Sequence, residues 1–215
     1  AREKTWAAAT KAKHLATIAG ALRRLPLYTT EGKAVILSAD PMWTDTMKGA
    51  RLEVNVVPPK QAYPATLPDI EKAIPNLQLT DQVALIVAWL TTARMGDVLQ
   101  MTADDLVLGS STLQANFKRG KRARFQGPYS VTTAITKTWL DMVQALLRTK
   151  KPGEFLWNFP TLSARLGAQG ALLHRIRTAS GNDKMESRGI RRGALQALAK
   201  GGTSEQDLLL FSGHS

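Results

Sequence analysis

Five prolines between residues 56 and 75 constrain the fold of this chain more than any other local feature: Pro58, Pro59, Pro64, Pro68 and Pro75. Proline lacks a backbone N–H and fixes its own φ, so a stretch this dense in proline forms neither an internal strand nor a long helix. We therefore expect residues 58–75 to be a linker with room for one short helix over residues 68–73. The linker separates an N-terminal segment, residues 1–57, from a larger domain, residues 76–215.

The N-terminal segment is predicted to be helical. Residues 3–27 carry an apolar stripe with basic residues largely off it, which is typical of an amphipathic helix. The stripe consists of Leu15, Ile18, Ala19, Leu22 and Leu25. A second helix is expected from Pro41 to about Val54, because proline after Asp40 suits the first turn of a helix.

The larger domain is predicted to be mainly helical with a small sheet near its start. Residues 80–91 are apolar nearly all round, which indicates a central, buried helix. Three short strands separated by glycine turns are expected at residues 105–108, 112–118 and 124–131. Further helices are expected at residues 95–101, 132–147, 161–178, 188–200 and 204–211. The predicted fold class is therefore mainly α with a small three-stranded antiparallel sheet, an α+β arrangement.

The composition excludes several classes of function and favours a polyanionic partner. The chain has 215 residues, a net charge of +12 and no cysteine. Without cysteine there are no disulfide scaffolds, thiolate zinc sites or cysteine nucleophiles. The histidines lack the spacing of metal ligands, so no metal is expected, and the longest apolar run, residues 83–90, is too short for a membrane span. The basic excess favours nucleic acid as the partner.

Two arginines stand where their charge needs an explanation. Arg94 follows the buried helix, and Asp97 lies one turn later, so the two form either an ordinary surface ion pair or part of a site. Arg191 falls within the apolar stripe of its predicted helix, between Leu195 and Leu198. A guanidinium there requires an anion, which is either a bound phosphate or a buried carboxylate such as that of Asp97.

A basic segment at residues 116–125 surrounds Gly120 and is predicted to form the tip of a β-hairpin. Its basic residues are Lys118, Arg119, Lys121, Arg122 and Arg124. Such a tip either contacts a nucleic-acid backbone or is a solvated turn, and the net charge favours the nucleic acid. His214, taken alone, is an exposed residue that follows the end of a predicted helix.

The order of these features resembles the catalytic domain of tyrosine recombinases, the phage-integrase superfamily, whose chemistry type IB topoisomerases share. Residues 93–105 resemble the first arginine box of the family. Residues 190–194 are similar to the second box, in the form seen in eukaryotic mobile elements of the DIRS type. Lys118 is similar to the hairpin lysine, and the Ser-Gly-His sequence that ends at His214 resembles the Leu-Gly-His box. The resemblance covers about residues 60–215.

The resemblance implies a site-specific DNA recombinase or integrase, of transposon or phage type, that cleaves and rejoins DNA through a 3′-phosphotyrosine link without metal or cofactor. Arg94 and Arg191 would bind the scissile phosphate, and His214 would donate a hydrogen bond to it. Lys118, with Lys121 as the reserve candidate, would protonate the leaving 5′ oxygen.

The resemblance also implies partners and a location. Double-stranded DNA is the expected partner, and family members act as tetramers on two DNA sites. Residues 1–57 would belong to a DNA-clamping core-binding domain. The expected DNA-binding residues are Lys11, Lys13, Arg23, Arg24, Arg119, Lys121, Arg122 and Arg124. The expected location is the nucleus for a eukaryotic source and the cytoplasm or nucleoid for a bacterial or phage source.

Two departures from the family pattern keep other interpretations open. Arg188 takes the place of a histidine or lysine three residues before Arg191, and an arginine stays protonated, although it can donate to phosphate. Tyr28, Tyr63 and Tyr129 all lie elsewhere than shortly after His214, so we expect the nucleophile downstream of residue 215. The alternative is a non-catalytic DNA-binding or architectural protein derived from a recombinase. Composition alone also permits a basic subunit of an RNA–protein assembly.

Overall fold

The chain divides into two units between Gln61 and Ala62. The structure, a computed structural model, describes residues 8–24, 40–56, 61–159 and 161–212. The boundary corrects the predicted linker at residues 58–75, because most of that segment belongs to the second unit. Ile70, Ala73 and Ile74 are buried in its core.

The prolines of this segment are compatible with helix because of where they stand. Pro68 lies in the first turn of α3 (Leu67–Ala73), and Pro75 lies in the first turn of the 3₁₀ helix η2 (Ile74–Asn76). The N–H of a residue in the first turn has no acceptor within the helix, so a proline there removes no hydrogen bond. Thr66 and Asp69 form a capping box that begins α3. The short helix expected over residues 68–73 is therefore confirmed as α3, whereas the prediction that the whole segment is a linker is wrong.

The first unit contains two helices that pack on each other, α1 (Ala8–Arg24) and α2 (Pro41–Val56). Both were predicted, and the outer residues of the expected first helix, 3–7 and 25–27, lie outside the described residues. The Asp40 carboxylate accepts hydrogen bonds from the backbone N–H groups of Met42 (2.8 Å) and Trp43 (3.2 Å). Asp40 therefore caps α2, and Pro41 occupies its first turn, as the sequence indicated.

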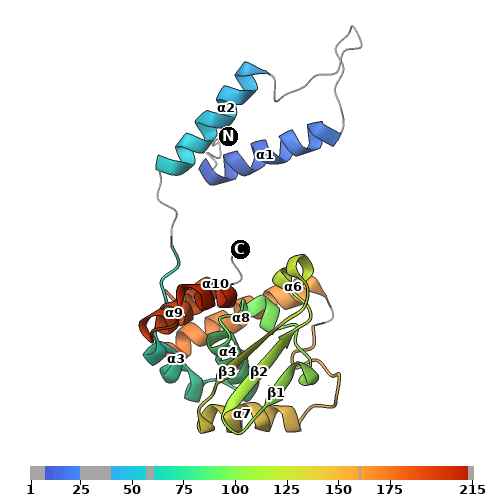
Figure 1. The fold of residues 1–215 in the computed structure, drawn as a ribbon, viewed down its shortest axis with the longest axis vertical. Helices are drawn as coiled ribbons and strands as arrows, with labels where there is room; N and C mark the ends of the chain where they lie inside the picture. The colour runs from blue at the N-terminus through green and yellow to red at the C-terminus, as the bar shows by residue number, and fades with distance from the viewer. Residues whose placement is uncertain (1–7, 25–39, 57–60, 160, 213–215) are drawn as a thin grey trace. The chain divides into compact units, whose positions relative to one another are not determined.

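The second unit follows the predicted order of helices around a small sheet (Figure 1). After η2 come α4 (Leu79–Leu90), α5 (Met95–Val98), η3 (Ala103–Asp105), β1 (Leu106–Leu108), β2 (Thr112–Phe117), α6 (Lys121–Gln126) and β3 (Tyr129–Ala134). The remaining helices are α7 (Lys137–Arg148), α8 (Leu162–Ser180), α9 (Ser187–Lys200) and α10 (Glu205–Ser212). The fold class is confirmed: the unit is mostly helical with one three-stranded antiparallel sheet in the order β1-β2-β3.

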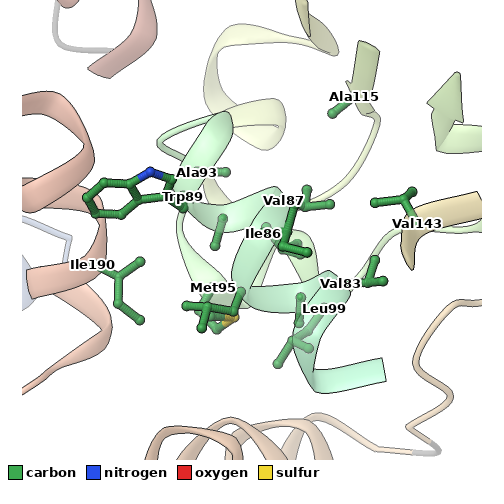
Figure 2. Packing of buried hydrophobic residues seen from close by; sticks show 14 of the residues in the cluster. Val83, Ile86, Val87, Trp89, Ala93, Met95, Leu99, Ala115, Val143 and Ile190 are labelled. Atoms are coloured by element: carbon green, nitrogen blue, oxygen red, sulfur yellow. The ribbon is translucent and has the colours of Figure 1, made fainter. Parts of the chain in front are cut away.

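Helix α4 is the centre of the hydrophobic core, as its all-round apolar sequence predicted. Every residue from Val83 to Trp89 is buried. Figure 2 shows the side chains of this helix between Ile190 of α9 on one side and Ala115 of β2 and Val143 of α7 on the other. The helix thus connects the sheet to the helix that carries Arg191.

The region around the basic segment differs from the prediction. The third strand begins at Tyr129 rather than at residue 124, because residues 121–126 form the short helix α6. Gly120 (φ +107°) and Gly127 (φ +84°) flank this helix with backbone conformations that favour glycine. The next helix, α7, begins at Lys137 rather than at residue 132, because Thr136 caps it.

A close contact between α9 and residues 63–65 fixes the position of the α9 helix. The Ala65 N–H donates to the Gly189 carbonyl at 3.0 Å. A side chain at Gly189 would collide with the Tyr63 carbonyl, and one at Gly193 with the Ala65 carbonyl. Both positions therefore require glycine, because backbone rather than a movable side chain lies opposite them.

We predict opposite effects for two helical glycine-to-alanine substitutions. Gly193→Ala should lower the free energy of unfolding by about 1–3 kcal/mol, because the added methyl group forces α9 away from Ala65. Gly170→Ala in α8 is the control: it meets no atom within 4 Å, and should raise that free energy by up to about 1 kcal/mol through helix propensity. Urea unfolding followed by circular dichroism measures both. Equal stability of the two variants would contradict the close contact.

Candidate active site

Arg94 is placed by a sharp reversal of the chain between α4 and α5. Thr92 has a positive φ of 51°, and its hydroxyl donates to the Phe211 carbonyl of α10 at 3.2 Å. Arg94 then stands immediately before α5, with its Nη1 atom 3.7 Å from the Asp97 Oδ2 atom. The predicted pairing is confirmed, and it joins an arginine side chain that is 41% exposed to an aspartate side chain that is only 6% exposed.

Asp97 also holds the basic segment against α5. Its Oδ1 atom accepts a hydrogen bond from the Lys121 backbone N–H at 3.0 Å. Gly120 passes so close that any side chain there would collide with the Asp97 carboxylate. One carboxylate thus joins the segment that carries Arg94 to the basic segment, where Lys121 lies 24 residues after Asp97 in the chain.

Arg191 lies three residues after Arg188 in α9 and is half-buried. The charge of Arg94 acts on it. Burial lowers the pKa of Arg191, and the positive charges of Arg94 and Arg122 lower it further, while Tyr129 and Asp97 act in the opposite direction. The lowered pKa means that burial and the nearby positive charges outweigh the effect of Tyr129 and Asp97 on Arg191. A bound anion would relieve that repulsion.

Arg122 is the residue whose position the sequence reasoning did not foresee. It was expected only as one of several DNA-contacting residues on a hairpin tip. Helix α6 turns it inward, so that its guanidinium carbon lies 4.0 Å from the centroid of the Tyr129 ring. From there its positive charge acts on Arg191 and lowers the pKa of that residue. No signal in the sequence marked it, because a hairpin and a short helix present different side chains inward.

Tyr129 is held on both faces of its ring. Arg122 covers one side, and Phe117 stacks on the ring with centroids 4.9 Å apart, as the β2–β3 register dictates. Burial raises the pKa of Tyr129, and the charge of Asp97 raises it further, against the opposite effect of Arg122, Arg191 and Arg94. The residue therefore packs beside the arginines and is harder to ionise than an ordinary tyrosine.

Lys118 pairs with a second buried carboxylate. Its Nζ atom lies 2.8 Å from Asp105 Oδ1, with the lysine side chain 53% exposed and that of Asp105 1% exposed. Asp105 Oδ2 accepts hydrogen bonds from the backbone N–H and the hydroxyl of Thr102 at 2.8 and 2.9 Å. Burial alone would raise the pKa of Asp105, but Lys118 and Thr102 outweigh burial and hold this pKa below its ordinary value. The sequence did not indicate this pair.

The other predicted site residues are distributed as follows. Arg119, Lys121 and Arg124 are exposed on the basic segment, and Arg188 is exposed in the first turn of α9. Lys13 is exposed on α1. His214 and the side chains of Lys11, Arg23 and Arg24 lie outside the described residues.

The described residues offer neither a cluster of metal ligands nor a membrane-spanning helix. No group of three or more histidine, aspartate or glutamate side chains there is arranged to hold a metal ion. In the same parts of the chain, no helix has the length and apolar character needed to cross a membrane.

The sequence matches no family model and no curated protein, but the fold matches solved structures. An XerH site-specific recombinase bound to palindromic difH substrate, a post-cleavage complex, aligns with a TM-score of 0.56 and 12% identity over 99% of this chain and 67% of that one. The Tn1549 transposon integrase in complex with transposon right-end DNA aligns with a TM-score of 0.55 and 13% identity, over 100% of this chain and 88% of that one.

A further XerH structure, a pre-cleavage complex on difH, aligns with a TM-score of 0.55 and 13% identity over 72% of this chain. The alignment spans only 47% of that recombinase. At these identities the likeness concerns the fold. The second unit has the architecture of a tyrosine recombinase catalytic domain, a mostly helical unit with a three-stranded antiparallel sheet.

We predict that Lys118 and Lys121 differ in their effect on stability. Lys118→Met removes the ion pair of a fully buried carboxylate and should lower the free energy of unfolding by about 1–2 kcal/mol, less than for a fully buried pair because Lys118 is half-exposed and screened by solvent. Lys121→Met should change it by less than about 0.5 kcal/mol, because only its backbone bonds to Asp97. Urea unfolding at neutral pH measures both, and a stable Lys118→Met variant would argue against the Asp105 pair.

We also predict that Tyr129 ionises at a higher pH than an ordinary tyrosine. Its raised pKa means that the folded state disfavours the tyrosinate, so the folding free energy that depends on Tyr129 is fully present below pH 10.0 and is lost as the pH rises above it. Absorbance at 295 nm, compared between the wild-type chain and Tyr129→Phe, should assign to Tyr129 a midpoint above 10.0. A midpoint at or below the ordinary value would contradict the burial of the ring.

Proposed function

We propose that this chain is the DNA-cleaving and rejoining part of a site-specific tyrosine recombinase or integrase, of transposon or phage type. The observation that carries the proposal is that Arg94 lies 3.7 Å from the buried Asp97 carboxylate while the charges of Arg94, Arg122 and Asp97 act on Arg191, in a unit with the fold of these enzymes. The three guanidinium groups come from three separate elements, α9, α6 and the residue before α5. Their common neighbourhood is therefore a product of the fold and not of sequence proximity.

Phosphate is the anion that this arrangement fits. A guanidinium donates two parallel hydrogen bonds to phosphate oxygens, and two of them stabilise the charge that develops when the phosphorus is attacked. The Arg94–Asp97 separation of 3.7 Å is too long for a good hydrogen bond, so Asp97 orients Arg94 while leaving its donors available for a phosphate. Arg188, one turn before Arg191, would be a further phosphate ligand, because it stays protonated.

The proposed leaving-group acid is Lys118, with Lys121 in reserve. Asp105 positions the Lys118 ammonium at the start of the basic segment, and Arg119, with Nη1 3.6 Å from the other Asp105 oxygen, can compensate that carboxylate when Lys118 turns to the DNA. In the reaction, a tyrosine oxygen forms a bond to phosphorus, the bond to the 5′ oxygen breaks, and the lysine proton passes to that oxygen. His214 would donate a hydrogen bond to the phosphate.

The nucleophile of this proposal is a tyrosine that follows His214. Tyr129 is a poor candidate although it lies near the arginines, because its ring is fixed between Phe117 and Arg122 and burial raises its pKa. Tyr63 is exposed beside a bridge to Met185, at the contact with α9.

The proposed partner is double-stranded DNA, and the proposed assembly is a tetramer on two DNA sites. The XerH and Tn1549 integrase structures that share the fold contain DNA. The net charge of +12 supports a polyanionic partner here as well. We propose residues 1–57 as part of the DNA clamp, with a nuclear location for a eukaryotic source and a cytoplasmic or nucleoid location otherwise.

We test the proposal by covalent trapping on nicked duplex DNA with the parent polypeptide, whose C-terminal peptides are first mapped to find the tyrosine. Arg94→Ala and Arg191→Ala should each lower the rate of adduct formation by about 10²–10³-fold, because each removes charge stabilisation that is needed in the transition state. Their affinity for duplex DNA should change by less than about threefold, since a single phosphate contact contributes little to binding.

Arg148→Ala serves as the matched control, because Arg148 is exposed at the end of α7, and it should leave adduct formation unchanged. Strong, salt-dependent binding of duplex DNA by the wild-type protein with no covalent adduct would contradict catalysis. It would support the second candidate, a DNA-binding or architectural relative of the recombinases. The arginine at position 188, in place of a histidine or lysine, also favours this candidate. Preference for RNA over duplex DNA would contradict both.

A further inference from the structure

A hollow lined by aromatic and arginine side chains lies next to the basic segment. It has a volume of about 260 Å³. Its walls come from the end of α5, the residue after Lys118, residues 155–159 and the start of α8. The lining residues are Leu99, Gln100, Arg119, Phe155, Trp157, Phe159, Thr161 and Arg165. The proposed phosphate chemistry uses none of the aromatic residues in this aromatic hollow.

The aromatic hollow continues into a larger basic hollow of about 560 Å³. Gln100, Arg119 and Arg165 line both, and the basic hollow adds Lys118, Lys121 and Arg124. None of the described residues that line either hollow is acidic. The basic hollow also has one aromatic residue, the exposed Phe125. The two hollows therefore share three lining residues, and the basic side chains gather in one while three of the four aromatic residues line the other.

Hydrogen bonds join the backbone and the Trp157 side chain of the aromatic end to neighbouring segments. Leu156 N–H donates to the Met101 carbonyl at 3.0 Å, and Ala103 N–H donates to the Glu154 carbonyl at 2.9 Å. Trp157 Nε1–H donates to the Thr80 carbonyl at 3.2 Å. These bonds fix the segment that carries Phe155 against the core, and fixed segments lower the cost of ordering on binding.

Arg119 is held in place as well. Its guanidinium carbon lies 5.1 Å from the Phe155 ring centroid, and its Nη1 atom donates to the Gln100 carbonyl at 3.2 Å. Phe155 itself is 41% exposed, although it is a large apolar side chain. A fixed planar cation beside an exposed aromatic ring offers flat surfaces on which another planar group can stack.

We propose that the aromatic hollow binds a nucleobase that is unpaired from its duplex, with the adjoining phosphates in the basic hollow. Stacking on aromatic and guanidinium planes is how proteins bind unpaired bases, and a positive groove follows the backbone of the same strand. An apolar peptide would gain nothing from Arg119 and Arg165, and a phosphate alone would gain nothing from the aromatic rings. The inference rests on DNA as the partner under the proposed function.

The test compares two short duplexes of the same sequence, one fully paired and one with a single extrahelical 2-aminopurine nucleotide. Fluorescence anisotropy at a fixed salt concentration gives the affinity of the 215-residue chain for each. The wild-type chain should prefer the duplex with the extrahelical base by about tenfold, and stacking should quench the 2-aminopurine fluorescence.

Phe155→Ala should abolish this preference while leaving the affinity for the paired duplex within about twofold. Phe155→Leu should behave like Phe155→Ala, because it keeps an apolar side chain but removes the aromatic face, whereas Phe155→Tyr should retain the preference. Tyr63→Ala is the matched control, because Tyr63 is 42% exposed and lies at the contact with α9, and it should have no effect. Thermal unfolding verifies that each variant is folded, as expected for an exposed side chain.

Several results would overturn the proposal. If Phe155→Ala loses equal affinity for both duplexes, Phe155 is a general DNA contact. If Phe155→Leu keeps the preference for the extrahelical base, the base is buried against an apolar side chain without stacking. Displacement of the extrahelical base by an acidic, phenylalanine-containing peptide would assign the hollow to a protein partner. Binding of the paired duplex without any preference overturns the base site alone, whereas no binding of either duplex overturns the proposed function as well.

Discussion

The candidate site depends on one buried carboxylate, that of Asp97. A carboxylate taken out of water must be compensated by donors and opposite charge. Asp97 obtains them from the Lys121 backbone N–H and from Arg94, which lie on segments that the sequence keeps apart. The requirement for glycine at position 120 follows from the same contact, because only a residue without Cβ can pass so close to this carboxylate. The basic segment is thereby tied to the first arginine box at a defined point.

The second constraint is the balance of charge around that point. The charges of Arg94 and Arg122 lower the pKa of Arg191, and the charge of Asp97 acts in the opposite direction. A second buried carboxylate, Asp105, holds Lys118 and Arg119 on the other side of the basic segment. The protein therefore uses its buried acids to orient basic side chains rather than to neutralise them all. The resulting surface is complementary to a polyanion, and most so where the guanidinium groups converge.

The elements whose prediction differed from the structure share a physical reason. The segment from residue 62 to residue 75 was taken as linker on proline count, yet Pro68 and Pro75 occupy first turns of helices, where proline is favourable. Residues 121–126 were taken as part of a hairpin, yet two glycines with positive φ allow a separate short helix. In each case the local pattern permitted two conformations, and packing selected one of them. The change from hairpin to helix matters most, since it turns Arg122 towards Tyr129.

The sequence by itself determined the properties that depend on local pattern and on charge. The all-round apolar residues 80–91 indicated a central helix, the glycine turns indicated a small sheet, and the basic excess indicated a polyanionic partner. It also singled out Arg94, Arg191 and Lys118 by their place in the chain. The sequence also indicated the Arg94–Asp97 pair, because the two residues are one helical turn apart. Only the tertiary structure decided that Lys118 pairs with Asp105, that the Lys121 backbone contacts Asp97, and that the charges of Arg94 and Arg122 act on Arg191. These contacts lie between different elements, and their energies depend on burial, which no local pattern encodes.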